Sequence, residues 1–86
     1  MRTAADRLVD AGYEDVVVFE NPGYDNALIG VTSDDRAVYD FDKMVEGLMA
    51  EYHIDQYEAI EWIEYNAVRA LPYVDGSPVI VYRLED

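Results

Sequence analysis

The chain has 86 residues, and its 19 acidic against 6 basic side chains give a formal net charge of −13 at pH 7. We expect one domain over residues 1–86 with a single modest core, because so short a chain buries only about 60–70% of its unfolded surface. The charge excludes nucleic acids and anionic membranes as direct partners, since both repel a polyanion, and the lack of cysteine excludes disulfides and thiolate chemistry.

The first predicted element is a short helix over residues 3–11. Thr3 and Asp6 have the spacing of a capping box, in which two side chains satisfy free backbone N–H groups at a helix start. Gly12 suits the position after a helix end, because glycine adopts left-handed backbone angles without strain. Since this segment has no apolar signal core and no stretch is apolar enough to span a bilayer, we expect a soluble cytoplasmic protein.

Three strands are predicted next. β-Branched and aromatic residues fill positions 16–19 and stop at a turn-forming Asn-Pro-Gly sequence. Residues 24–31 predict a second strand and residues 37–39 a third, joined by the turn-rich residues 32–36. Three strands in succession favour an antiparallel meander.

A longer helix is predicted over residues 41–52. Asp40 is a suitable N-cap, because its carboxylate can accept a hydrogen bond from a free N–H of the first turn. The apolar side chains of this helix recur at intervals that place them on one core-facing stripe: Met44, Val45, Leu48, Met49 and Tyr52.

The next helix has the clearest start signal. Asp55 and Glu58 form a capping box, and apolar residues then recur at helical intervals as far as Leu71. Pro72 is expected to end this helix, because proline has no N–H to donate and its ring clashes with the preceding turn. A turn and a last strand over residues 79–83 follow.

The predicted fold is therefore of the α+β class, in the order helix, three strands, two helices, strand. We expect a small antiparallel sheet of about four strands with helices packed on one face. Pairing of the last strand beside the first is the simplest closure, although the sequence pattern does not fix the strand order.

Side chains suited to catalysis are few and scattered. His53 is the only histidine and lies between two predicted helices, so we interpret it as a solvated or capping residue. Ser33 and Ser77 lie in predicted turns without a nucleophile motif. The acids of residues 34–42 lack the spacing of a calcium loop and allow at most a weak surface site for a divalent ion. We therefore predict no enzyme, no catalytic residues, no dedicated metal site and no cofactor.

The arrangement of the acidic residues is more informative. Glu58, Glu61 and Glu64 recur every third residue, which places neighbouring carboxylates on adjacent turns of one helix. Further acids extend the negative surface along the preceding helix and into the turn: Asp42, Glu46, Glu51 and Asp55. Two interpretations remain open. The acids keep the domain soluble, or they imitate the phosphates of a nucleic-acid duplex and bind a basic groove on another protein.

Two aromatic residues belong to the same candidate surface. Trp62 and Tyr65 lie three residues apart, offset from the side of the helix that carries Ile60 and Ile63. Tryptophan and tyrosine beside acids make effective interface anchors. The structural alternative is that they complete the core of a small domain.

Four segments carry a resemblance to known proteins: ALIGV (27–31), RAVYDFDKM (36–44), EAIEWIEYNAVRALPY (58–73) and PVIVYRL (78–84). Together they resemble short acidic proteins of unassigned activity that gut bacteria, their phages and their mobile elements encode. In size, acidity and absence of cysteine the chain is also similar to DNA-mimicking anti-CRISPR proteins, which block target-DNA recognition by a CRISPR effector. This second likeness lies in physical character and not in any motif.

These resemblances imply a non-enzymatic inhibitor that acts in the cytoplasm of a bacterial host. Its partner would be a basic nucleic-acid-binding protein such as a subunit of a CRISPR effector. The alternative is a small protein-interaction module of a phage or mobile element, monomeric or homodimeric, in which apolar and aromatic side chains make the contact and the acids only keep the protein soluble.

Overall fold

The sheet of this protein has three strands, and the computed structural model that reveals it describes residues 3–84. Its strands are β1 (Leu28–Val31), β2 (Ala37–Asp40) and β3 (Val79–Val81), in the spatial order β1-β2-β3. β1 pairs antiparallel with β2, whereas β3 pairs parallel with β2. The predicted mixture of helices and strands is correct, but the sheet is mixed and three-stranded, not antiparallel with about four strands.

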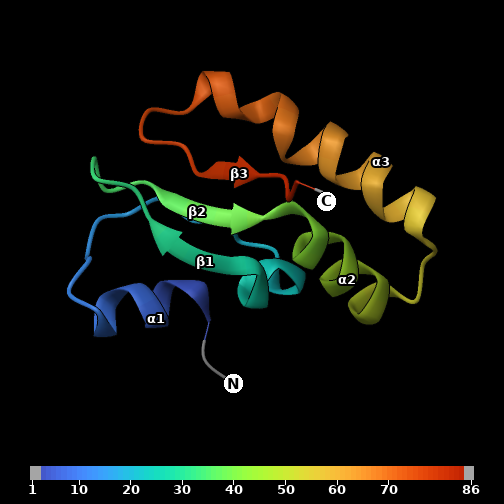
Figure 1. The fold of residues 1–86 in the computed structure, drawn as a ribbon, viewed down its shortest axis with the longest axis horizontal. Coiled ribbons are helices and arrows are strands. Elements are labelled where there is room, and N and C mark those ends of the chain that lie inside the picture. The colour runs from blue at the N-terminus through green and yellow to red at the C-terminus, as the bar shows by residue number, and fades with distance from the viewer. Residues whose placement is uncertain (1–2, 85–86) are drawn as a thin grey trace.

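The parallel pairing follows from the long connection between β2 and β3. The chain leaves β2 directly into α2 (Phe41–Tyr52), then forms α3 (Gln56–Asn66) and the 3₁₀ helix η2 (Val68–Tyr73) before it returns to the sheet. A helical crossover of this length lets the returning strand run in the same direction as β2. The last strand therefore lies beside β2, and its predicted position beside the first strand was wrong. In the view of Figure 1, α1 (Ala4–Asp10) lies on the β1 side of the sheet and α3 on the β3 side.

The predicted strand over residues 16–19 is an irregular segment that pairs with no strand among residues 3–84. Val16, Val18 and Phe19 pack against the core, so their apolar character reflects burial alone. The backbone N–H of Phe19 donates to the side-chain hydroxyl of Tyr39 at 3.2 Å, in place of a ladder hydrogen bond. Residues 16–19 thus have the composition of a β-strand although they do not join the sheet.

Only the second half of the second predicted strand is a β-strand. Its first part belongs to the 3₁₀ helix η1 (Pro22–Ala27), and only Leu28–Val31 join the sheet. Pro22 stands at the start of η1, where its fixed φ suits a helical turn, and the Asn21 side chain accepts the N–H of Gly23 at 2.9 Å. These local signals outweigh the strand tendency of the residues that follow.

The first helix, α1 (Ala4–Asp10), has the predicted caps. Thr3 and Asp6 make both hydrogen bonds of a capping box. After the helix, Gly12 has φ of 97°, and Tyr13 donates its N–H to the carbonyl of Leu8 at 2.8 Å, so the helix ends in a Schellman motif. The Arg7 guanidinium donates to the carbonyls of Asp25 and Leu28 and so fixes α1 against the start of β1.

The helices α2 and α3 supply most of the remaining core. Met44, Val45 and Leu48 of α2 are buried as predicted, but Met49 and Tyr52 at the end of the same stripe are exposed. Ala59 and Ile63 provide the buried side of α3. This helix ends at Asn66 and not at Leu71, because Pro72 disfavours α-helical geometry in the turn before it, and residues 68–73 wind as η2 instead.

A glycine pair brings η1 and α2 into close contact. A Cβ atom placed on Gly47 would lie 1.8 Å from the carbonyl oxygen of Gly23, closer than any real contact allows. The contact places Asn21 beside the end of α2, where its side-chain oxygen accepts the hydroxyl of Tyr52 at 3.3 Å. Glycine at position 47 is therefore a packing requirement.

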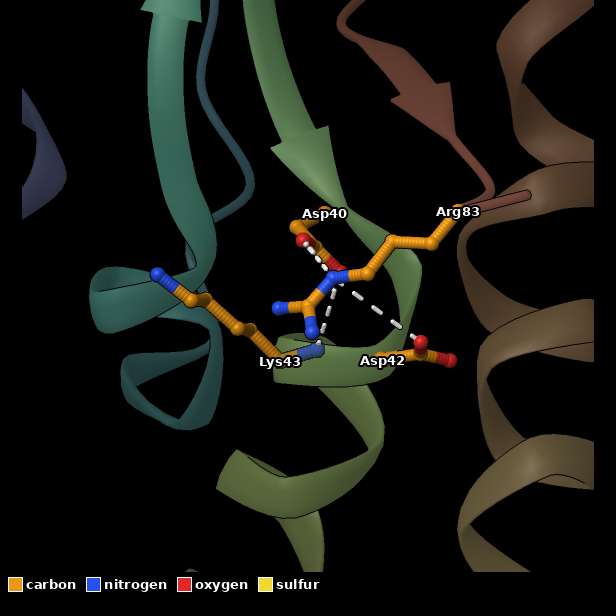
Figure 2. Close-up of polar contacts among 4 residues, drawn as sticks. All are labelled: Asp40, Asp42, Lys43 and Arg83. Carbon is orange, nitrogen blue, oxygen red and sulfur yellow. Dashed lines mark hydrogen bonds and ion pairs between the residues drawn. The ribbon is translucent and has the colours of Figure 1, made fainter. Parts of the chain in front are cut away.

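The start of α2 is linked to the end of the sheet by a buried carboxylate, shown in Figure 2. Asp40 is 5% exposed and caps α2 by accepting the N–H of Lys43, as predicted. Arg83, just after β3, donates its Nε to the other Asp40 oxygen at 2.7 Å. Burial alone would raise the pKa of Asp40, but the hydrogen bonds from Arg83 and from the Lys43 N–H outweigh it and hold that pKa below its ordinary value.

Candidate protein-binding surface

All nine residues that the sequence assigns to a partner-binding surface are exposed. They lie on α2, on the turn after it and on α3: Asp42, Glu46, Glu51, Asp55, Glu58, Glu61, Trp62, Glu64 and Tyr65. The structure does not gather them into one strip. It places two pairs of acids in two separate grooves and leaves the other three acids outside both.

The first groove, here named the aromatic–acidic groove, has a volume of about 480 Å³. It lies between the end of α2 and the solvent side of α3. Its lining combines three aromatic rings, two carboxylates, an aliphatic side chain and an amide: Tyr52, Trp62, Tyr65, Glu58, Glu61, Ile54 and Asn66.

Local sequence signals explain why this groove forms. Asp55 caps α3 by accepting the N–H of Glu58 at 2.9 Å, as predicted, but the Glu58 carboxylate does not accept the N–H of Asp55 in return, so the predicted capping box is only half formed. His53, between the helices, has φ of 55°, a left-handed conformation that ends α2 and reverses the chain sharply. The reversal brings Tyr52 of α2 against Trp62 of α3, with ring centroids 6.0 Å apart and planes inclined by 30°.

Both aromatic residues predicted as anchors are available to a partner. Trp62 is 46% exposed and Tyr65 is 66% exposed, so neither completes the core. Asn66 donates its side-chain N–H to the carbonyl of Trp62 at 3.1 Å, which leaves its side-chain oxygen free to accept. The Arg69 guanidinium lies 5.3 Å from the centroid of the Tyr65 ring, at cation–π distance.

Sequence reasoning missed three members of this groove: Tyr52, Ile54 and Asn66. Tyr52 was assigned to the core because it fits the apolar stripe of α2. Its exposure could have been predicted from its position as the last residue of α2, directly before the C-cap. A side chain at the end of a helix extends beyond the turns that pack against the core.

The second groove, here named the Arg83 groove, lies on the other flank of the α2–α3 pair. Asp42 and Glu46 line it together with Arg83 and five further residues: Phe41, Val45, Met49, Gln56 and Ile60. Arg83 Nε is 3.9 Å from the Asp42 carboxylate, and Figure 2 shows Arg83 between Asp40 and Asp42. Its hydrogen bond to Asp40, followed by the charges of Asp40, Asp42 and Glu46, raises the pKa of Arg83. The negative charge of this groove is therefore partly compensated.

Three predicted acids line neither groove: Glu51, Asp55 and Glu64. Helical geometry explains the separation, because each residue turns the side chain by about 100°. Glu51 is five residues beyond Glu46 and so points away by about 140°, while Glu64 is about 120° away from Glu58. Only Glu58 and Glu61 of the predicted carboxylate series share a groove.

The surface is nevertheless strongly negative. Residues 41–66 contain seven acidic side chains and one basic side chain, Lys43. Two arginines elsewhere are held by internal carbonyl groups, since Arg7 donates to those of Asp25 and Leu28, and Arg36 donates to that of Ser77. Among residues 3–84, the one ion pair made by the seven acids of residues 41–66 is that of Asp42 with Arg83.

A smaller hollow of about 240 Å³ adjoins the aromatic–acidic groove and shares Trp62 and Asn66 with it. Tyr24 lines this hollow, and its buried hydroxyl has no hydrogen-bond partner among residues 3–84. Burial, together with the nearby Tyr52, raises the pKa of Tyr24 to about 12.

Comparison with protein families, with curated proteins and with solved structures finds no match to this chain. Among residues 3–84, none of the helices combines the length and apolar character that a membrane crossing requires.

Proposed function

We propose that this protein is a non-enzymatic inhibitor of a bacterial defence effector of the CRISPR type, and that it blocks DNA recognition by occupying the effector's basic DNA-binding groove. The observation that carries the proposal is the charge of residues 41–66, where seven exposed carboxylates accompany a single lysine. The partner is a basic nucleic-acid-binding protein in the host cytoplasm, and no nucleic acid or membrane is contacted directly.

The spacing of the carboxylates supports the proposal. An α-helix rises about 1.5 Å per residue, so Glu58 and Glu61 are separated by about 4.5 Å along the axis of α3. Phosphates along one DNA strand are separated by about 3.4 Å along the duplex axis. Arginine and lysine side chains placed to contact successive phosphates are flexible enough to meet carboxylates at this similar spacing.

The test is charge reversal of Glu58, Glu61 and Glu64 to lysine in one variant. We expect this variant to lose inhibition of target-DNA binding by purified CRISPR effector–guide complexes, measured by electrophoretic mobility shift. The matched control reverses Glu14, Asp15 and Asp75, which are exposed and lie outside α2 and α3, and it should inhibit like the wild type. Unchanged inhibition by the α3 variant would contradict the proposal.

The second candidate function is a protein-interaction module of a phage or mobile element. The aromatic–acidic groove favours it, because exposed Trp62 and Tyr65 are typical interface anchors. Salt separates the two functions. A DNA-mimicking complex weakens steeply as salt rises, whereas a mainly apolar interface, including a homodimer, changes little.

A further inference from the structure

The aromatic–acidic groove has unsatisfied negative charge at its rim. The carboxylates of Glu58 and Glu61 make no hydrogen bond or ion pair within residues 3–84. The two residues are one helical turn apart, so both carboxylates can reach a single cation between them. Asn66 lines the same groove, and its side-chain oxygen accepts no hydrogen bond among residues 3–84.

The aromatic rings of the groove favour the same kind of ligand. Cations are attracted to the faces of tryptophan and tyrosine rings, and Trp62 and Tyr65 are both accessible. Arg69 of the chain itself already makes a cation–π contact with the Tyr65 ring, 5.3 Å from its centroid, but Arg69 is not one of the residues that line the groove. The cation of the Arg83 groove, in contrast, is supplied by the chain itself.

The chemistry of the groove lining favours arginine over lysine. A guanidinium is planar, stacks on aromatic rings and donates several N–H groups at once to neighbouring oxygens. A lysine ammonium is a strongly hydrated point charge that uses neither the rings nor the spread of acceptors as well. Arginine, tryptophan and tyrosine are also the residues most enriched at interface hot spots.

We propose that the aromatic–acidic groove binds an arginine side chain of the basic partner protein, with Glu58 and Glu61 on its guanidinium and with Trp62 and Tyr65 against its flat face. This inference rests on the proposed function, because it names the partner group that the same surface recognises. It assigns the specific contact to this groove and leaves the Arg83 groove and the remaining acids to long-range attraction.

The test uses Nα-acetyl-arginine amide as the probe, with the lysine analogue and the uncharged citrulline analogue as comparisons, followed by ¹H–¹⁵N NMR of the full chain. The arginine probe should shift the signals of residues 52–66, including the indole N–H of Trp62, in a saturable way. Lysine should bind several-fold more weakly, and citrulline should give no saturable shift. Equal binding of citrulline, or shifts centred on the Arg83 groove, would overturn the inference.

Paired variants separate the groove from net charge. Glu58→Gln with Glu61→Gln should weaken arginine binding several-fold, because the variant lacks both carboxylates that pair with the guanidinium. The control variant, Asp42→Asn with Glu46→Gln, removes the same charge outside the groove. Its change in log Kd for the arginine probe should be less than half of the change caused by Glu58→Gln with Glu61→Gln. Tyr65→Leu should weaken binding, whereas Tyr73→Leu, at an exposed tyrosine outside the groove, should not. Equal effects within either pair would overturn the inference.

The same variants separate this inference from the proposed function. If the arginine probe binds in the groove but no effector is inhibited, the arginine site stands and the proposed function fails. If charge reversal abolishes inhibition but the Glu58→Gln and Glu61→Gln variant inhibits fully, the proposed function stands and the arginine site fails. Self-association detected by sedimentation equilibrium, together with a concentration-dependent shift of the Trp62 indole N–H signal, would show that the groove receives a second copy and would also overturn the inference.

Discussion

Two buried tyrosines illustrate how one hydroxyl group can stabilise or destabilise the same core. The hydroxyl of Tyr39 accepts the N–H of Phe19, whereas the hydroxyl of Tyr24 is without a partner among residues 3–84. A buried polar group without a hydrogen bond carries its desolvation cost uncompensated. We therefore expect the Tyr24 hydroxyl to lower the stability of the domain, while the Tyr39 hydroxyl joins the unpaired segment 16–19 to β2.

Replacement of Tyr24 by phenylalanine should raise the free energy of unfolding by about 1 kcal/mol at neutral pH. It should also change the response to alkali. In the unfolded chain Tyr24 ionises near pH 10, but in the native state its pKa is about 12. Wild-type stability therefore declines as pH rises from about 10 to 12, and the variant lacks that part of the decline. Urea denaturation at about pH 8 and pH 11 measures both effects.

Tyr39→Phe provides the control for this substitution. It removes the acceptor of the Phe19 N–H, so we expect a loss of about 1–2 kcal/mol at neutral pH. Equal destabilisation by the two substitutions would show that the Tyr24 hydroxyl has a stabilising partner after all.

At the scale of elements, the contact of η1 with α2 leaves no room for a Cβ atom at position 47. Gly47→Ala adds a methyl group that favours an isolated helix by about 1 kcal/mol. Here the methyl group would overlap the Gly23 carbonyl, so the two elements must separate. We expect a net loss of about 1–3 kcal/mol in the free energy of unfolding, measured by urea denaturation.

Gly30→Ala is the matched control, because a Cβ atom at this position in β1 meets nothing within 4 Å. Its stability should stay within about 0.5 kcal/mol of the wild type. A Gly47→Ala protein as stable as the Gly30→Ala protein would mean that η1 and α2 separate at little cost.

The caps of the helices were predictable, and the pairing of the strands was not. Thr3, Asp40 and Asp55 each act on a backbone N–H no more than three residues away, so the sequence alone identifies them. Strand pairing depends on distant segments. Residues 16–19 have strand composition but no partner, and β3 takes the free edge of β2 from far along the chain.

In the candidate site, too, local features were predictable from the sequence and long-range contacts were not. The exposure of Glu58, Glu61 and Trp62 follows from helix periodicity, which the sequence contains. Helix periodicity does not predict which residues from other elements lie beside them. Tyr52 reaches Trp62 only because His53 adopts a left-handed conformation, and Arg83 reaches Asp42 only because β3 lies beside β2.

For the molecule as a whole, the net charge of −13 makes salt act in opposite directions on the free domain and on its complex. Repulsion among exposed carboxylates destabilises the free domain at low ionic strength, and salt screens it. We expect the melting temperature to rise by several degrees from about 20 mM to about 500 mM NaCl, measured by circular dichroism, while the proposed complex weakens over the same range.

The charge-reversed α3 variant, in which lysine replaces Glu58, Glu61 and Glu64, tests the cause of this salt effect. It reduces the net negative charge by six units, so its melting temperature should depend less on NaCl than that of the wild type. An equal dependence in both proteins would assign the effect to general ion hydration and not to repulsion among carboxylates.

The stacked pair of Tyr52 and Trp62 has an optical consequence. Trp62 is the only tryptophan of the chain, so all indole fluorescence originates within the aromatic–acidic groove. A half-exposed indole emits at longer wavelength than a covered one, and any ligand that seats against it shifts the emission to the blue. The unlabelled protein therefore carries its own fluorescent reporter at the surface where a partner is expected to bind.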